Sequence, residues 1–145
     1  MHSYKYPRPA ITVDAAVFSE MDAQWHILLI QRAKAPFVGM WALPGGFVDE
    51  NELLEHACRR ELTEETGIVL PSMQQFRVFD GLGRDPRERV LSVVFYAEIA
   101  GCPKPSASDD ASEARWFPLH DLPPLAFDHA LIIERMMEQP GVFKA

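Results

Sequence analysis

The fold of this chain is decided by the stretch Gly45-Gly46-Phe47-Val48-Asp49-Glu50-Asn51-Glu52-Leu53-Leu54-Glu55-His56-Ala57-Cys58-Arg59-Arg60-Glu61-Leu62-Thr63-Glu64-Glu65-Thr66-Gly67-Ile68. It reads as a glycine loop, one helix and a stop. Asn51 suits the position before a helix, where its side chain can accept from an orphan backbone N–H, and Gly67 suits a left-handed C-cap. Because Pro44 and the two glycines break any preceding strand, the pattern predicts a helix over residues 52–66.

One face of this predicted helix carries charge where apolar residues are expected. At about 100° per residue, its apolar stripe contains Leu53, Leu54, Ala57, Cys58 and Leu62. Glu61, Glu64 and Glu65 fall inside the same stripe, because residues three and four apart are neighbours on a helix. Like charges at the edge of a core repel and are poorly solvated, so they persist only if protonated, paired with cations or bound to metal.

Metal binding is the simplest interpretation of these three carboxylates. Carboxylate oxygens select hard divalent ions, and Mg²⁺ usually keeps several waters and takes its remaining ligands from the phosphates of a substrate. The pattern therefore predicts a substrate that bears phosphate. The alternative is an ordinary amphipathic helix whose acidic residues pair with lysine and arginine side chains elsewhere in the chain.

The same stretch resembles the signature of the Nudix hydrolases. As it stands here, that signature is Gly46, five residues, Glu52, seven residues, Arg60-Glu61-Leu62, one residue, Glu64-Glu65, one residue, and Gly67-Ile68, without a departure. The resemblance implies an α/β fold, a Nudix α/β/α sandwich with a mixed β-sheet between helices. It also implies an enzyme that hydrolyses a nucleoside diphosphate linked to another group. The metal ligands would be Glu61, Glu64 and Glu65, with the carbonyl of Gly46 as a further candidate, and Arg60 would orient a glutamate of this box.

Composition places further bounds on the chain. Its 145 residues fit a single domain, with the box at residues 46–68, and its net charge of −7 argues against binding to nucleic acid or to an anionic membrane. Cys58 and Cys102 form no CxxC motif and are interpreted as free thiols in a reducing compartment. Because the sequence has neither an apolar leader nor a run long enough to span a bilayer, it predicts a soluble, cytoplasmic protein without a membrane partner.

Apolar and β-branched runs predict strands over residues 10–18, 25–31, 76–80 and 90–99, the last of them central, and a short strand at residues 116–117. A second helix is expected over residues 129–138, capped by Asp128 and packed through Leu131, Ile132, Met136 and Met137. The five histidines lack ligand spacing and are expected at the surface or as caps. Phe37 and Trp41 are expected near the glycine loop, either filling the core or forming a wall for a nucleobase.

Candidate substrate contacts lie outside the box. Arg32, at the end of a predicted strand, is expected to meet a phosphate or else to be a solvated strand end. Arg84 and Arg87 lie in a predicted loop over residues 81–88, where their planar forks could bind phosphate or ribose. In the alternative interpretation, Arg84 simply pairs with Asp85.

Three flanking segments also resemble the ADP-ribose pyrophosphatase branch of the family: residues 8–14, the loop over residues 81–88, and the Leu-Ala-Phe-Asp-His phrase at residues 125–129. In that phrase, Phe127 and Asp128 are candidates to border the base or the ribose. A loop is expected over residues 101–112, and Glu113 follows it just before the short strand. Many members carry an acid there that supports a metal or acts as a base. The alternative for Glu113 is a surface or turn acid.

Together these features predict Mg²⁺-dependent hydrolysis of ADP-ribose to AMP and ribose 5-phosphate, with Mn²⁺ as a substitute ion. The candidate catalytic residues are Glu61, Glu64, Glu113 and Arg60, and the sequence leaves open which carboxylate takes the proton of the attacking water. Two alternatives stay open: an enzyme of the same family that cleaves nucleoside triphosphates, including oxidised ones, and a non-catalytic ADP-ribose sensor. The expected partner is a small-molecule nucleotide and not nucleic acid, and exposed apolar residues at the start of the chain are compatible with a homodimer.

Overall fold

The computed structural model describes residues 3–108 and 111–142. Its elements follow one another along the chain as β1 (Ala10–Met21), β2 (Gln24–Arg32), β3 (Trp41–Ala42), β4 (Gly45–Phe47), α1 (Leu54–Thr66), β5 (Gln74–Phe79), β6 (Val90–Glu98), β7 (Ala111–Pro118) and α2 (His129–Glu138). Within these residues, no helix has both the length and the apolar character needed to cross a bilayer.

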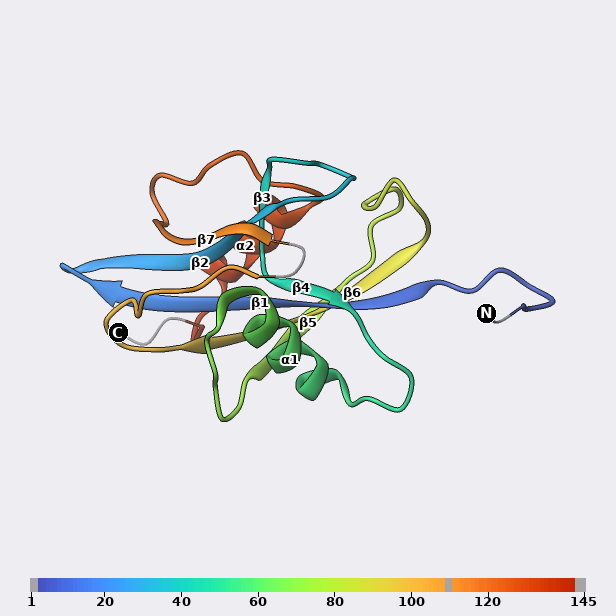
Figure 1. Cartoon of the computed structure of the whole chain (residues 1–145), viewed down its shortest axis with the longest axis horizontal. Coiled ribbons are helices and arrows are strands. Elements are labelled where there is room, and N and C mark those ends of the chain that lie inside the picture. The colour runs from blue at the N-terminus through green and yellow to red at the C-terminus, as the bar shows by residue number, and fades with distance from the viewer. Residues whose placement is uncertain (1–2, 109–110, 143–145) are drawn as a thin grey trace.

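All of these strands belong to one mixed sheet (Figure 1). Its main path runs β3-β2-β1-β6-β5, with β4 paired to β1 and β7 paired to β2. β1 runs parallel to β6 along one edge, whereas the other edge pairs antiparallel with β4 at residues 12–14 and with β2 at residues 18–21. β1 therefore lies in the middle of the sheet and pairs with β2, β4 and β6. β6, the predicted central strand, is the interior strand beside it.

β1 and β2 separate where the edge of β1 stops pairing with β2 and pairs with β4 instead. β7 occupies one edge of β2, so the other edge pairs with β1 at residues 24–27 and with β3 at residues 30–31. The chain leaves β3 and, after Leu43 and Pro44, joins β1 as β4, with the N–H of Ala15 donating to the carbonyl of Pro44 at 2.7 Å. The predicted glycine loop is therefore partly a strand, because it contains β4; the segment over residues 43–47, which keeps the name glycine loop below, connects β3 beside β2 to the edge of β1.

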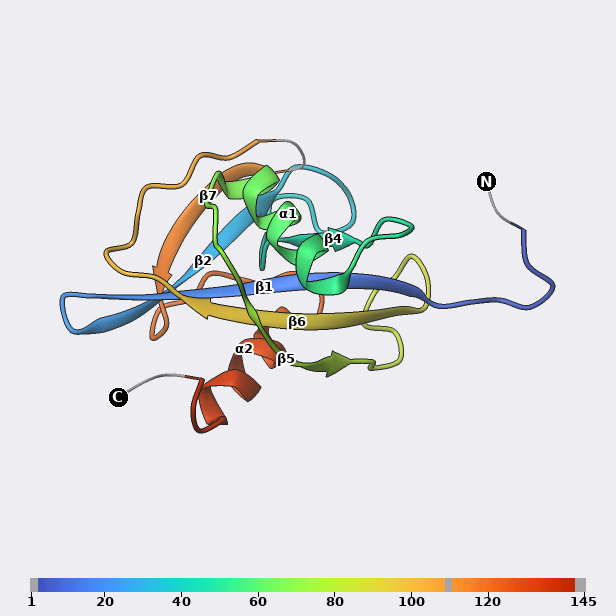
Figure 2. The same cartoon turned by 90° about the horizontal axis from the view of Figure 1, so that it is seen from below.

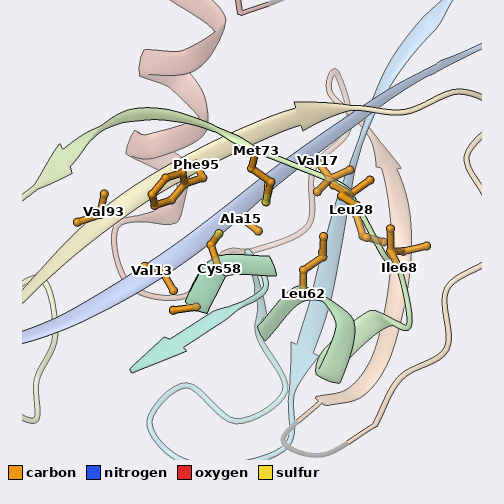
Figure 3. Packing of buried hydrophobic residues seen from close by; sticks show 12 residues of the cluster. Val13, Ala15, Val17, Leu28, Cys58, Leu62, Ile68, Met73, Val93 and Phe95 are labelled. Carbon is orange, nitrogen blue, oxygen red and sulfur yellow. The ribbon is translucent and has the colours of Figure 1, made fainter. Parts of the chain in front are cut away.

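Helices cover opposite faces of the sheet (Figure 2). Successive side chains of a strand point to opposite faces, so β1 contributes to two apolar layers. The layer on the α1 side includes Val13, Ala15, Val17, Cys58 and Leu62, all fully buried (Figure 3). The layer on the α2 side includes Ala16, Phe18, Ile132, Ile133 and Met136. The predicted α/β/α sandwich with a mixed sheet is confirmed, and both cysteines are free thiols.

The start of α1 differs from the prediction, whereas its end agrees. The N–H of Glu52 donates to the carbonyl of Asp49 at 3.2 Å, and the N–H of Asp49 donates to the Glu52 carboxylate at 3.0 Å. Residues 49–52 therefore form a separate turn in which Asn51 has a φ of 67° and does not cap the helix. Leu53, predicted in the apolar stripe, is the N-cap residue and is 79% exposed. Gly67 ends α1 with a φ of 75°, as predicted, and its N–H donates to the carbonyl of Thr63.

α2 has the predicted bounds, but a different face is buried. Its core side contains His129, Ile132, Ile133 and Met136, whereas Leu131 and Met137 are 40% and 49% exposed. The expectation that all histidines lie at the surface or act as caps is therefore wrong for His129. Asp128 occupies the N-cap position but makes no capping hydrogen bond, because its carboxylate binds an arginine described below.

Replacing Gly67 with alanine is expected to destabilise the fold by about 1 kcal/mol, because a side chain disfavours the left-handed conformation at φ 75°. An added Cβ would have ordinary contact with Ser106 at 3.6 Å, so backbone strain and not a clash causes the loss. Gly81→Ala is the matched control, since Gly81 has open space and no positive φ. Urea denaturation measures both free energies of unfolding, and equal effects would contradict the assignment of Gly67 as a strained cap.

Candidate active site

Arg60 is the cation around which the acidic residues of the box are arranged. Its guanidinium makes a two-point contact with the Glu52 carboxylate, at 2.6 Å from Nε and 2.9 Å from Nη2. Nη1 donates to Glu61 at 3.0 Å and lies 3.3 Å from Glu64. The contact predicted between Arg60 and a glutamate of the box is therefore present, in the bidentate geometry that is the strongest for this pair.

These contacts fix the charge state of the network. The hydrogen bonds from Arg60 lower the pKa of Glu52 to about 2, and Glu52 in turn raises the pKa of Arg60 above its usual value. Both groups are therefore charged at neutral pH. The alternative of ordinary ion pairing is right in part, because Arg60 also pairs with Glu61 and Glu64.

The glycine loop lies directly against two of the acids. The N–H of Gly45 donates to Glu65 Oε1 at 2.8 Å, and Glu65 is 6% exposed. A Cβ at Gly46 would stand 2.7 Å from Glu61 Oε1, so a side chain here would push the Glu61 carboxylate away, whereas glycine lets the backbone approach it closely. Glu64 exposes 43% of its side chain. The prediction that all three acids lie within the apolar stripe is therefore wrong for Glu64.

The donor set of this site fits a hard divalent cation. Its side-chain donors are carboxylate oxygens, which Mg²⁺ and Mn²⁺ accept as ligands. Among residues 3–108 and 111–142, no three acidic, histidine or cysteine side chains converge on one point as they stand. Instead, Nη1 of Arg60 holds a positive charge between Glu61 and Glu64, so these two carboxylates already share one cation.

A cleft of about 160 Å³ opens beside the glycine loop. Its charged lining consists of Asp14, Arg32, Lys34, Glu65, Arg84, Asp85 and Arg87. The cleft therefore combines carboxylates from β1 and α1 with cations from the end of β2 and from the loop over residues 81–88. Such a lining suits a polyanion that divalent ions bridge to the acids.

Arg84 and Arg87 line the cleft, but the guanidinium group of each already binds a carboxylate. Arg84 donates from Nε and Nη2 to both oxygens of Asp128, at 2.9 and 2.6 Å, and its side chain is 6% exposed. Arg87 donates in the same way to Asp85, at 3.0 and 2.7 Å. The alternative in which Arg84 pairs with Asp85 is therefore wrong. Either arginine could bind phosphate through Nε and Nη2 only if its ion pair broke. Nη1 of Arg87 is a donor that Asp85 does not use.

The ion pair between Arg87 and Asp85 stabilises the charged form of both groups. Burial alone would raise the pKa of Asp85, but the hydrogen bonds from Arg87 hold that pKa below its ordinary value. The same contact raises the pKa of Arg87. Both partners therefore stay charged at neutral pH, and the pair holds the Arg87 guanidinium in place at the cleft.

Phe127 lies in the wall of the cleft in a strained backbone conformation. Its φ is 54°, which a bulky residue rarely adopts. The Phe127 ring lies 4.9 Å from the ring of Phe37 and 5.0 Å from the Arg32 guanidinium. The Arg87 guanidinium stands 5.8 Å from Phe127 and 5.3 Å from the ring of Phe47. The structure thus brings together Arg32, Arg87 and Phe127, three of the predicted substrate contacts.

Of the predicted site residues, Arg60, Glu61, Glu64 and Asp128 lie next to the cleft lining through their contacts but are not part of it, and Trp41 and Glu113 also do not line the cleft. Trp41 is 9% exposed and packs edge-on against Phe117, so it fills the core. Glu113 lies inside β7, which begins at Ala111, and not in a loop before the strand as predicted. Its Cα pairs with Gln31 and its carboxylate contacts Arg115, so it stands outside the cleft lining. The predicted loop over residues 101–112 also contains Asp109 and Asp110, which lie outside the described residues.

Several cleft residues were not assigned from the sequence. Asp14, Lys34, Phe47 and His129 all line the cleft. Asp14 could have been identified from the sequence, because a carboxylate inside the apolar run over residues 10–18 needs a polar partner or a functional role. Nothing local distinguished Lys34, Phe47 or His129.

A glycine loop set against an acidic helix, on one face of a mixed sheet covered by helices on both sides, is the arrangement of the Nudix class of hydrolases. The NUDIX domain model matches residues 8–138, and the chain belongs to this family. The predicted membership is therefore confirmed.

Several similar proteins carry ADP-ribose in their names. An ADP-ribose pyrophosphatase of Methanocaldococcus jannaschii is 45% identical over 132 residues, which are 91% of this chain and 75% of that protein. An ADPR responsive transcriptional repressor, NtrR, of Acinetobacter baylyi is 37% identical over 134 residues, which are 90% of this chain but 54% of the repressor. The NUDIX domain of Shewanella oneidensis NrtR, solved with ADP ribose, has a TM-score of 0.86 at 37% identity and covers 92% of this chain and 89% of that one. The resemblance to the ADP-ribose pyrophosphatase branch is confirmed.

Glu52→Gln is expected to lower the free energy of unfolding at neutral pH, and this loss should shrink in acid. The wild-type carboxyl has a folded pKa of about 2, below its ordinary value of 4.5, so its stabilisation is fully present above pH 4.5 and is lost as the pH falls through about 2. Denaturation of both proteins across this range measures the difference. The control is Glu138→Gln, at an exposed ion pair. A loss that is independent of pH would contradict the role of the Arg60–Glu52 contact.

Proposed function

We propose that this protein hydrolyses ADP-ribose to AMP and ribose 5-phosphate with Mg²⁺ as its cofactor and Mn²⁺ as a substitute. One observation carries the proposal: the glycine loop contacts Glu61 and Glu65 at the edge of a cleft whose other walls are rich in arginine and lysine. This arrangement suits a diphosphate held between divalent ions and cationic side chains. The pyrophosphatase relative and the NUDIX domain solved with ADP ribose support the choice of substrate.

In the proposed site, Glu61, Glu64 and Glu65 would hold the divalent ions, with the carbonyl of Gly46 as a further candidate ligand. Such ions, when bound, neutralise the diphosphate oxygens and lower the pKa of water. A water attacks one phosphorus atom, the bond from that phosphorus to the bridging oxygen breaks, and the bridging oxygen leaves with the other phosphate. We assign the proton of this water to Glu64, because Arg60 holds Glu64 beside Glu61, whereas the Glu113 carboxylate contacts Arg115 in β7.

The remaining cleft residues would hold the two halves of the substrate. Arg32, Lys34 and Nη1 of Arg87 would meet phosphate or ribose oxygens, and Phe127 would border the base or the ribose. We give Arg84 and Asp128 a different role from the one first expected. Their part-buried ion pair fastens the loop over residues 81–88 to the start of α2, so the loop presents Arg87 to the cleft.

A substrate panel separates this proposal from its rivals. Phosphatase-coupled phosphate release from ADP-ribose is compared with release from ordinary and oxidised nucleoside triphosphates, each with Mg²⁺ and with Mn²⁺. We expect kcat/KM to be highest for ADP-ribose, and a preference of about a hundredfold or more for any triphosphate would overturn the choice of substrate. A protein that binds ADP-ribose without cleaving it would be a sensor. A single domain over residues 1–145, a cytoplasmic location and a homodimer stay predictions.

Glu64→Gln is expected to lower kcat for ADP-ribose by about 100-fold or more, because it removes a metal ligand and the proposed base. Its stability should change by less than about 1 kcal/mol, since the Glu64–Arg60 contact is a long pair at an exposed side chain. Measurements of AMP release and of thermal unfolding test both halves. Glu138→Gln should retain both properties. An unfolded Glu64→Gln protein would identify Glu64 as a structural ion-pair residue.

A further inference from the structure

The imidazole of His129 takes the place of a backbone carbonyl beside the glycine loop. Residues 124–126 run parallel to β3, with the N–H of Trp41 donating to the carbonyl of Pro124 at 3.2 Å and the N–H of Ala126 donating to the carbonyl of Trp41 at 2.8 Å. At Phe127 the chain then turns into α2, and the carbonyl of Ala126 accepts the N–H of His129 instead. The next donor along the glycine loop, the N–H of Leu43, therefore donates to His129 Nδ1, at 3.0 Å in the protein interior.

The other nitrogen of the same ring faces a buried carboxylate. His129 is 3% exposed, and burial lowers its pKa although Asp14 opposes that change, so the ring is neutral at physiological pH. Because Nδ1 accepts a hydrogen bond, the proton is on Nε2, which lies 3.6 Å from Asp14 Oδ1. Asp14 is 7% exposed, and its second oxygen accepts a hydrogen bond from the hydroxyl of Ser92. The carboxylate is thus held between α2 and β6.

Asp14 in turn lies directly against the glycine loop. A Cβ at Gly45 would stand 2.5 Å from Asp14 Oδ1, so the backbone of Gly45 packs closely against this carboxylate. The N–H of Gly45 is the group that donates to Glu65. Contacts therefore run without interruption from His129 through Asp14 and Gly45 to Glu65, a proposed metal ligand.

We propose that His129 is a positioning residue that, through Leu43 and Asp14, fixes where the glycine loop stands against Glu61 and Glu65. This inference rests on the proposed function, because it concerns the metal site assigned there. Asp128, the preceding residue, binds Arg84 of the loop over residues 81–88. The start of α2 therefore fastens the two loops that border the cleft, one through each of two successive side chains.

The test uses the whole chain and Mn²⁺ alone. His129→Leu removes both the acceptor for Leu43 and the donor toward Asp14, and we expect it to weaken Mn²⁺ binding by about 10- to 100-fold, the effect usual for a group that supports metal ligands. The loss of the free Mn²⁺ signal in electron paramagnetic resonance measures this affinity. For ADP-ribose hydrolysis, kcat should fall by a similar factor, while KM changes by less than about threefold.

Control and rescue variants separate positioning from stability. Ile132→Ala removes a fully buried side chain from the same helix on the core side of α2, so it should lower the melting temperature and leave Mn²⁺ affinity within about twofold of wild type. His129→Asn places a carbonyl near the position of Nδ1, and His129→Gln places an amide donor near Nε2. Each should restore part of the affinity that His129→Leu loses, and both carry the test if the leucine variant does not fold.

The outcomes are distinct. Wild-type Mn²⁺ affinity in His129→Leu, or equal losses in His129→Leu and Ile132→Ala, would overturn the positioning role. Loss of Mn²⁺ affinity in His129→Leu with recovery in either amide variant supports it. A wild-type protein that binds Mn²⁺ but does not cleave ADP-ribose would reject the proposed substrate without affecting this comparison. A wild-type protein that binds no Mn²⁺ would reject the metal site, and this inference with it.

Discussion

The two-point contact between Arg60 and Glu52 is the interaction on which the rest of the site depends. It ties the turn before α1 to the middle of the helix. With the fork of Arg60 fixed by Glu52, Nη1 stands between Glu61 and Glu64, and Nη2 lies 3.4 Å from the carbonyl of Phe47 in the glycine loop. Carboxylates on adjacent helical turns repel one another. One guanidinium therefore keeps an acidic helix face intact and aligned with the glycine loop.

The position of the cleft follows from how the sheet is built. β1 and β2 pair over only part of their length, and the chain crosses from one to the other at Leu43 and Pro44. Each helix contributes a side chain to this crossing from its own face of the sheet. Glu65 of α1 accepts the N–H of Gly45, and His129 of α2 accepts the N–H of Leu43. The backbone donors of the glycine loop are thus satisfied from both layers, and the loop is held at the edge of the cleft.

Local patterns in the sequence predict the end of α1 and the bounds of α2, although not the start of α1, where residues 49–52 form a turn of their own. The family resemblance carried by residues 46–68 implies the sandwich and the Arg60 contact, Gly67 predicts the C-cap, and the apolar pattern predicts the bounds of α2. Such patterns fail where partners are distant. Arg84 has Asp85 next to it but binds Asp128, 44 positions away, and Asp128 is then lost as a helix cap. The choice among several carboxylates depends on packing in three dimensions, which no local pattern encodes.

The same limit explains Glu113 and His129. A short apolar run cannot show that a strand begins five residues earlier, at Ala111 and not at Trp116, so Glu113 was expected in a loop. The role of His129 depends on a gap in a backbone ladder that forms only when residues 124–126 lie beside β3. A histidine at the start of an amphipathic helix gives no sign of such a gap.

The most direct test of the central claim, that the acidic face of α1 gathers divalent ions against the glycine loop, is anomalous diffraction at the manganese edge. Crystals would be soaked with Mn²⁺ and a non-hydrolysable analogue of ADP-ribose. The account predicts anomalous peaks about 2 Å from carboxylate oxygens of Glu61, Glu64 and Glu65, with Arg60 still bound to Glu52. Crystals that contain the bound analogue but show no peak beside these side chains would contradict it.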